Sequence, residues 1–244
     1  MMFKYEHHNK IHRILNSLDT VLFRDIGAHF GGGTWISLLH GEYRWSKDVD
    51  FLCPIGAGYK RLRQVTAASD PAVLFSQTSS FTFPRSLTAN QYGVRFLVIV
   101  DDTPIKFEIV AEARIALAAP EYPTWLDVPC LAKVDRQAEK LLANADRWAD
   151  PSIESRDLID LAVLRLHEGK SDEAMCKAEA AYPVREPLRK ALVKFQGSEE
   201  YRDKCFSALQ IADRAMVIDG VDLLAADCGL EGTRRSHYEF RREF

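Results

Sequence analysis

The sequence reads Phe30-Gly31-Gly32-Gly33-Thr34 and, thirteen residues later, Asp48-Val49-Asp50-Phe51-Leu52. Three consecutive glycines have no side chains, so backbone N–H groups in this turn can approach a ligand closely. Residues 34–39 are then predicted to begin a helix, whose first amides and dipole favour an anion such as a triphosphate. Taken alone, the glycines also fit an ordinary tight turn, because they lack the lysine of a Walker loop and the spacing of a dinucleotide-binding motif.

Asp48 and Asp50 lie two residues apart in a segment that is predicted to be a strand. On a strand, residues i and i+2 point to the same face, so the two carboxylates should lie side by side. Their repulsion would raise one pKa unless a cation lay between them. Two hard oxygen ligands suit Mg²⁺, with Mn²⁺ as the alternative. The other interpretation is a solvated edge strand with an acidic face, although Val49, Phe51 and Leu52 indicate that the opposite face is buried.

Glu108 is the best candidate for a third carboxylate, which a two-metal site would need. It lies in the predicted strand 105–110, where Ile105, Phe107 and Ile109 occupy the other face. An acidic group in the middle of so apolar a strand is costly unless something pairs with it. The alternative is that Lys106, also two residues away, simply pairs with Glu108 on an exposed face.

The character of the sequence changes near residue 125. Before that point, β-branched and aromatic runs at 81–83, 94–100 and 105–110 predict strands, and 5–18 predicts an amphipathic helix. Asp101-Asp102-Thr103-Pro104 predicts an antiparallel turn rather than a metal pair. Beyond it, helices are predicted over 131–145, 157–167, 172–181, 187–195, 199–209 and 210–226. We therefore expect an α+β protein with a mixed-sheet α/β domain at 1–125 and a helical bundle at 126–244.

These segments together resemble a known family. Gly32-Gly33-Thr34 followed by Arg44-x-Ser46-x-Asp48-x-Asp50-Phe51 is similar to the AbiEii/AbiGii-type toxins of the DNA polymerase β-like nucleotidyltransferase superfamily. Lys106-x-Glu108 matches that family's third acidic motif. A fourth match is formed by Ala138-Glu139-Lys140-Leu141-Leu142-Ala143, then Asp146-Arg147 and Arg156-Asp157-Leu158-Ile159-Asp160-Leu161.

The resemblance implies roles for individual residues. Gly32, Gly33 and Thr34 would hold the nucleotide phosphates, and Asp48, Asp50 and Glu108 would form the catalytic metal site. The triphosphate pocket would be lined by Arg44, Ser46 and Lys47. Lys140 would neutralise phosphate charge, and Asp157 or Asp160 would partner it. Without the family pattern, Lys140 also fits a charge on a solvated helix face, and residues 156–160 an ordinary i, i+4 pair.

The function that this resemblance implies is metal-dependent transfer of a nucleoside monophosphate from a triphosphate such as ATP to an acceptor hydroxyl. The acceptor would be tRNA, another RNA or a protein, and the chain would be the toxin of a toxin–antitoxin or phage-defence pair with a cognate antitoxin. One alternative is a nucleotidyltransferase that modifies a small molecule such as an antibiotic. Another is a catalytically idle nucleotide-binding module.

The composition of the chain narrows the remaining classes of function and location. A formal net charge of −3 argues against a uniformly basic nucleic-acid coat but not against a local basic groove. Five scattered cysteines without a CxxC pair suit buried, reduced thiols. No segment has the length of a membrane-spanning helix, and the first ten residues lack a signal-peptide core, so we expect a cytoplasmic protein. The tail, with Arg234-Arg235, Arg241-Arg242 and interleaved Tyr238, Phe240 and Phe244, is expected to be a solvated end rather than a nucleic-acid contact.

Overall fold

A computed structural model describes residues 2–235 and 239 of the chain. The chain divides into two compact units. The first comprises Met1–Leu38 and Ser46–Ala132, and the second comprises Leu39–Trp45 and Lys133–Phe244. The short segment Leu39–Trp45 therefore leaves the first unit and returns to it, which the sequence pattern did not indicate. Of the residues noted in the tail, Tyr238, Phe240, Arg241, Arg242 and Phe244 lie outside the described part.

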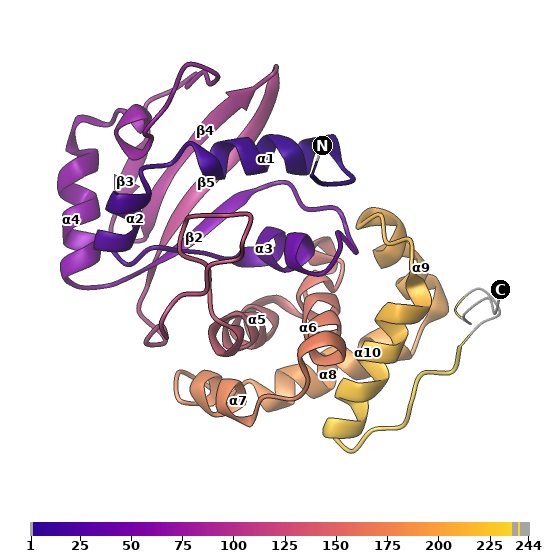
Figure 1. Cartoon of the computed structure of the whole chain (residues 1–244). Helices are drawn as coiled ribbons and strands as arrows, with labels where there is room; N and C mark the ends of the chain where they lie inside the picture. Colours follow the sequence, from indigo (N-terminus) through magenta and orange to yellow (C-terminus); the bar gives the residue numbers. More distant parts are fainter. Residues whose placement is uncertain (1, 236–238, 240–244) are drawn as a thin grey trace. The chain divides into compact units, whose positions relative to one another are not determined.

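The first unit is built on a mixed sheet, which confirms the α+β fold class (Figure 1). Within the described residues, five strands take the order β1-β2-β5-β4-β3. Their bounds are β1 His29–Phe30, β2 Val49–Pro54, β3 Thr88–Asn90, β4 Gly93–Val100 and β5 Thr103–Glu112. The pair β2–β5 is parallel, and the other neighbouring pairs are antiparallel.

Alternation along the central strands separates an apolar face from a charged one. Val49, Phe51, Phe107 and Ile109 are fully buried. They lie on the face that α1 (Glu6–Asn16) and α2 (Thr20–Asp25) cover (Figure 1). The ring of Phe23 in α2 lies 4.6 Å from that of Phe51, centroid to centroid. Because side chains alternate along a strand, Asp50 and Glu108 must point to the other face.

The turn between β4 and β5 is the one predicted at residues 101–104. Asp101 and Asp102 have φ angles of 46° and 61°, and Val100 pairs with Thr103 across the hairpin. Aspartate tolerates this left-handed region better than most residues do. Arg13 of α1 forms an ion pair with Asp101. Asp101 and Asp102 therefore form the turn of the hairpin, as predicted.

The remaining helices of the first unit are α3 (Gly32–Leu39), whose last residue belongs to the second unit, and α4 (Ala57–Val65), with 3₁₀ turns at Thr66–Ala68 and Pro71–Leu74. The sequence pattern missed α2, α4, β1 and β3. It also predicted a strand at 81–83, where the structure has only an isolated bridge between Thr82 and Ile99. These elements are short, so too few residues repeat in them to give a clear period.

The second unit is helical, as predicted. Its described helices are α5 Lys133–Arg147, α6 Arg156–Glu168, α7 Asp172–Glu179, α8 Arg185–Gln196, α9 Glu199–Ala208 and α10 Arg214–Asp227, with a 3₁₀ turn at Pro151–Ile153. The helix predicted from residue 210 begins later because Gln210 has a φ of 54° and the Asp213 carboxylate caps the amide of Met216. Such left-handed and capping positions end and begin helices.

All five cysteines are free thiols, but only three of them are buried. Cys53, Cys130 and Cys205 are buried, whereas Cys176 is exposed and Cys228 is half-buried, contrary to the expectation for these two. Burial raises the pKa of Cys53 to about 12, so this thiol is inert. Within the described residues, no helix is both long enough and apolar enough to span a membrane.

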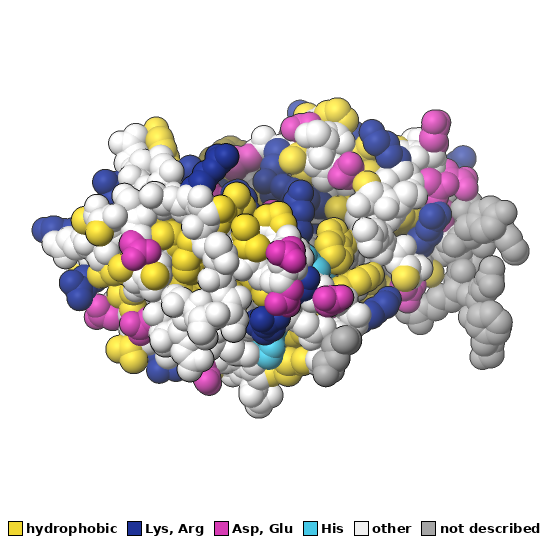
Figure 2. All heavy atoms as spheres, turned by 90° about the horizontal axis from the view of Figure 1, so that it is seen from above, with side chains coloured by type: hydrophobic (Ala, Val, Ile, Leu, Met, Phe, Trp, Pro, Cys, Tyr) yellow, Lys and Arg dark blue, Asp and Glu magenta, His cyan; other side chains and the backbone are white. Residues whose placement is uncertain are grey.

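Charge on the surface is mixed. On the face seen in Figure 2, the lysine and arginine side chains are interspersed with acidic and apolar ones. This agrees with the small net charge of −3 and with the absence of a basic coat on that face.

A close helix contact in the second unit gives a testable prediction. A Cβ added at Gly220 in α10 would lie 2.2 Å from the carbonyl oxygen of Ala162 in α6. Gly220→Ala should therefore force the two helices apart and lower the free energy of unfolding by about 1–3 kcal/mol. Urea unfolding followed by circular dichroism measures this. Gly232→Ala is the control, since its Cβ would meet nothing closer than 3.7 Å. Equal stability of the two variants would contradict the prediction.

Candidate functional site

The glycine turn packs directly against Asp50. Gly32 has a φ of 65°, and a Cβ built there would lie 2.6 Å from Asp50 Oδ2. The amide of Gly31 donates to the carbonyl oxygen of Asp50 at 2.8 Å. The turn is thus fixed to β2 by its backbone and can come this close only because residue 32 has no side chain.

Helix α3 starts at this turn. Its first backbone hydrogen bond runs from the Trp35 amide to the Gly31 carbonyl at 3.3 Å. The amides of Gly32, Gly33 and Thr34 precede that bond, so they have no acceptor within the helix. Amide groups at a helix N-terminus attract anions, which is the property predicted for a phosphate site.

Thr34 holds the segment that precedes β2. Its hydroxyl donates to the Asp48 carbonyl oxygen at 2.6 Å. Since its one proton is used there, the Ser46 hydroxyl must donate to Thr34, at 2.7 Å. The carbonyl oxygen of Ser46 is hydrogen-bonded to His8 Nε2 at 2.9 Å. The carbonyl oxygen of Lys47 is hydrogen-bonded to His7 Nε2, also at 2.9 Å. The side chains of Thr34 and Ser46 therefore position Asp48, while Lys47 is exposed.

The sheet register places two of the predicted carboxylates in one row. Asp50 on β2 is the Cα partner of Glu108 on β5, which in turn is the partner of Arg95 on β4. Directly paired residues share a face of the sheet, so these three side chains lie on the same side. Asp48 lies one residue before the first residue of β2, so strand alternation does not fix the direction of its side chain, contrary to the predicted strand. The sheet thus brings Asp50 and Glu108, two of the three predicted acidic residues, to one face, while Asp48 precedes it.

Glu108 is buried and paired with two basic side chains. Lys106 Nζ donates to its Oε2 at 2.5 Å, and Arg95 Nε donates to its Oε1. Burial by itself would raise the pKa of Glu108, but these two hydrogen bonds outweigh it and hold the pKa below its ordinary value. The pairing with Lys106 that the sequence allowed is therefore present. Arg95, which sequence reasoning missed, adds to it.

The acidic face fits a divalent cation in part. Mg²⁺ typically takes one or two protein carboxylates, and substrate phosphates and waters complete its shell. Asp48 and Asp50 suit that number. Among residues 2–235 and 239, no group of three or more His, Cys, Asp or Glu side chains is arranged to hold a metal ion. A cation ligated by Glu108 as well therefore stays a prediction.

A second cluster of predicted residues lies in the helical unit. Lys140 Nζ forms ion pairs with both Asp157 and Asp160, at 2.9 and 2.6 Å, so both of the alternative partners are real. Arg44 donates to Asp160 through Nε at 2.6 Å and Nη2 at 2.9 Å. Arg147 donates to Asp157 through Nε at 2.6 Å.

This buried ion network fixes the segment Leu39–Trp45 to α6. Asp160 has no exposed surface, and Arg44 is only 4% exposed. Burial alone would raise the pKa of Asp160, but Arg44 and Lys140 outweigh it and keep the carboxyl ionised. The Tyr43 hydroxyl also donates to Asp160, and burial, followed by the charge of Asp160, raises the pKa of Tyr43 well above its usual value. Charges this deep persist only when their partners satisfy them.

The structure thus sorts the predicted residues into two groups. The first unit holds one group: Gly32, Gly33, Thr34, Ser46, Lys47, Asp48, Asp50 and Glu108. The second unit holds the other: Arg44, Lys140, Asp157 and Asp160. Sequence reasoning missed Tyr43 and Arg95, and it quoted Arg147 within the fourth motif without giving it a role. Arg95 carried a signal, because its strand partner could have been found once the hairpin at 101–104 had fixed the register.

The fold has counterparts among solved structures. A protein from H. pylori, provisionally classed as a nucleotidyltransferase, matches with a TM-score of 0.50 and 16% sequence identity, over 91% of this chain and 92% of that one. JHP933 from Helicobacter pylori matches with a TM-score of 0.48 and 16% identity, over 91% of this chain and 89% of that one. At this identity the first likeness defines the fold alone, which is that of a nucleotidyltransferase-like α+β protein.

The family model described as nucleotidyl transferase AbiEii toxin, type IV TA system, matches residues 13–215. The chain belongs to this family, which confirms the resemblance inferred from the motifs. It is therefore a nucleotidyltransferase enzyme, and its family consists of toxins of type IV toxin–antitoxin systems. No curated protein matches the chain.

The buried network predicts a large, pH-dependent loss on changing Asp160. Asp160→Asn would leave Arg44 and Lys140 buried with less countercharge, so the free energy of unfolding should fall by about 3–5 kcal/mol. Because the folded pKa of Asp160 is depressed, its stabilisation is present above the unfolded pKa of about 4 and lost as the pH falls through the folded value. The variant should therefore lose less stability on acidification. Urea unfolding at pH 7 and below tests both points.

Asp203→Asn is the matched control in the same unit. Asp203 pairs with Arg214 at 2.6 Å but its side chain is 47% exposed, so its loss should change stability by less than about 1 kcal/mol. If Asp160→Asn behaved like Asp203→Asn, the network would not stabilise the unit.

Proposed function

We propose that this toxin-family enzyme transfers a nucleoside monophosphate from a nucleoside triphosphate to a hydroxyl group of an RNA, such as tRNA, and that it uses Mg²⁺. The observation that carries the proposal is the contact between Gly32 and Asp50. It sets amides suited to phosphate beside a carboxylate suited to a cation that accompanies phosphate. A cognate antitoxin is the expected protein partner, since the family is that of type IV toxin–antitoxin systems.

In the proposed reaction, the oxygen of the acceptor hydroxyl bonds to the α-phosphorus and its proton passes to solvent. The bond from that phosphorus to the α–β bridging oxygen breaks, and pyrophosphate leaves. The amides of Gly32, Gly33 and Thr34 bind phosphate oxygens, and Lys47 adds positive charge beside Asp48. A bound divalent ion would neutralise charge on the phosphates. Most of the rate then comes from positioning and charge stabilisation, as in other phosphoryl transfers.

Glu108 is proposed to change partners when substrate binds. In the structure, Arg95 and Lys106 form ion pairs with the two carboxylate oxygens of Glu108. Phosphate oxygens of the substrate can take over these two side chains, which are 43% and 48% exposed. Glu108 would then be free to complete the cation site with Asp48 and Asp50.

We assign Arg44, Lys140, Asp157 and Asp160 a positioning role. Each is buried in the ion network of the helical unit, so direct contact with a phosphate would require these pairs to break. Their substitution should therefore act through the stability of that unit.

The acidic pair is tested by the Asp48→Asn/Asp50→Asn double variant. Without its two carboxylates the site should lose cation and transition-state charge stabilisation, so transfer should fall by at least about 10³-fold with the fold intact. The assay incubates the protein with each α-labelled triphosphate, Mg²⁺ and total RNA, and circular dichroism checks the fold. Asp102→Asn is the control, since Asp102 is exposed in the hairpin of the same unit.

Parallel reactions with an aminoglycoside or total protein in place of RNA separate the alternative acceptors. Full transfer activity of the double variant would contradict the assignment of Asp48 and Asp50 to the catalytic site. Triphosphate binding without transfer to any acceptor would instead indicate an idle nucleotide-binding module.

The contact at Gly32 gives a second test. Gly32→Ala should displace Asp50 and lower RNA labelling about 100-fold, the usual cost of a misplacement of about 1 Å. Gly27→Ala is a close control, because Gly27 has a φ of 64° but its Cβ would meet only Pro54, at 3.9 Å. Both variants carry the same backbone strain, so the difference between them reports the displacement of Asp50. Equal activity would show that this contact does not shape the site.

A further inference from the structure

The helical unit contains a cavity that the proposed reaction does not use. It has a volume of about 420 Å³ and is lined by residues of α5, α6, α7, α8 and α10, together with the α6–α7 loop. This lies within the range of about 300–1,000 Å³ that is typical of small-molecule sites. Every lining residue belongs to the second unit, so the cavity is complete within it.

The floor of the cavity is aliphatic. Its apolar lining residues are Leu141, Leu161, Met175, Leu188 and Leu224, with the half-buried thiol of Cys228 among them. Among the residues that the structure describes, none that lines the cavity carries an aromatic ring. A flat nucleobase would therefore find no ring to stack on, whereas a flexible hydrocarbon chain suits leucine and methionine side chains.

Among the described basic residues that line the cavity, Arg185 is the one best placed to meet a ligand. Arg165 is bound to Asp227 at 2.7 Å and Lys170 to Asp172 at 2.9 Å, so these charges balance in pairs. Arg185 has only a 3.9 Å contact with Glu179, and its side chain is 66% exposed.

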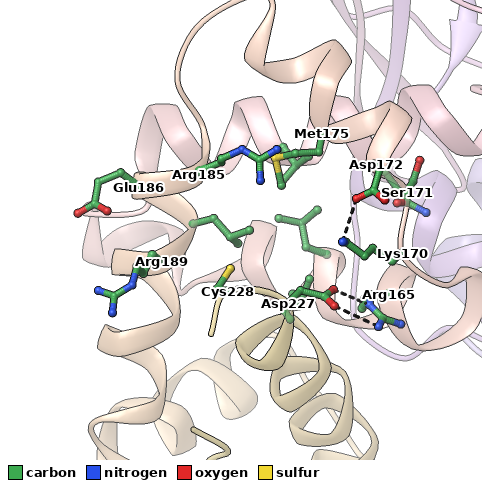
Figure 3. A pocket seen from close by; sticks show the side chains of 15 residues that line it. Arg165, Lys170, Ser171, Asp172, Met175, Arg185, Glu186, Arg189, Asp227 and Cys228 are labelled. Carbon is green, nitrogen blue, oxygen red and sulfur yellow. Dashed lines mark hydrogen bonds and ion pairs between the residues drawn. The ribbon is translucent and has the colours of Figure 1, made fainter. Parts of the chain in front are cut away.

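Figure 3 shows the Arg185 side chain reaching across the cavity toward Met175, while the side chains of Glu186 and Arg189 point away from it. Glu179 accepts from the amides of Val184 and Arg185 through Oε1, while its Oε2 lies 3.9 Å from Arg185 Nε, too far for a hydrogen bond. A ligand carboxylate could therefore form an ion pair with the guanidinium of Arg185 with little competition from Glu179.

We propose that this cavity binds a small aliphatic carboxylate, whose chain of about ten carbons fills the leucine-lined floor and whose head group meets Arg185. The site is independent of the nucleotidyl-transfer site. It makes the helical unit a receptor for an acyl-type anion.

Titration calorimetry with decanoate, below the concentration at which it forms micelles, tests the proposal on the full chain. One saturable equivalent should bind, and octanoate should bind about tenfold more weakly because two methylene groups are missing. Decanamide, which lacks the charge, should also bind about tenfold more weakly. Equal binding of decanoate and decanamide, or non-saturable uptake, would overturn the proposal. So would displacement of bound decanoate by AMP in a competition titration, since AMP would then occupy the cavity.

Arg185→Gln should weaken decanoate binding about tenfold. Lys190→Gln is the matched control, because it removes a cation from the same helix without touching the cavity, and it should leave the affinity unchanged. Equal affinities of the two variants would rule out Arg185 as the head-group ligand.

Cys228 gives a readout that does not depend on those substitutions. In a Cys176→Ser background, which removes the exposed thiol, saturating decanoate should slow alkylation of Cys228 by iodoacetamide several-fold. An unchanged alkylation rate would place any bound decanoate elsewhere.

Discussion

The first unit depends on the close approach of the glycine turn to Asp50. No side chain fits at residue 32, since a Cβ would come within 2.6 Å of the Asp50 carboxylate, and its φ of 65° is one that side chains disfavour. This one constraint explains several features together. It starts α3 at the edge of β2, turns the first amides of that helix toward the acidic face, and ties the position of Asp50 to the backbone of the turn.

The sheet converts that local contact into a site. Val49, Phe51, Phe107 and Ile109 are buried on one face, so the residues between them are held on the other by the geometry of the strands. The parallel pairing of β2 and β5 then puts Asp50 beside Glu108, although the two residues are 58 positions apart in the sequence. The apolar core thus fixes the acidic face more firmly than any contact between the acidic groups, which repel one another.

The helical unit is organised by a different interaction. Arg44 and Lys140 form ion pairs with the fully buried Asp160. Asp157 belongs to the same network because it pairs with Lys140 and Arg147. Such a network tolerates little change, because each charge satisfies another. It also explains why Leu39–Trp45 belongs to the helical unit although residues on both sides of it belong to the sheet unit. A motif that looked continuous in sequence, from Arg44 to Asp50, is shared between two units.

Several properties of this AbiEii-family nucleotidyltransferase were determined by its sequence alone. They are the alternation that makes β2, β4 and β5, the hairpin at Asp101-Asp102 and the helical second half. Each depends on residues that are close in the chain, where spacing dictates direction. Tertiary structure decided that Arg95 and Lys106 hold Glu108, that Arg44 pairs with Asp160, and that five helices line an aliphatic cavity. These contacts join residues far apart in the chain, and only the packing of the core determines which of them meet.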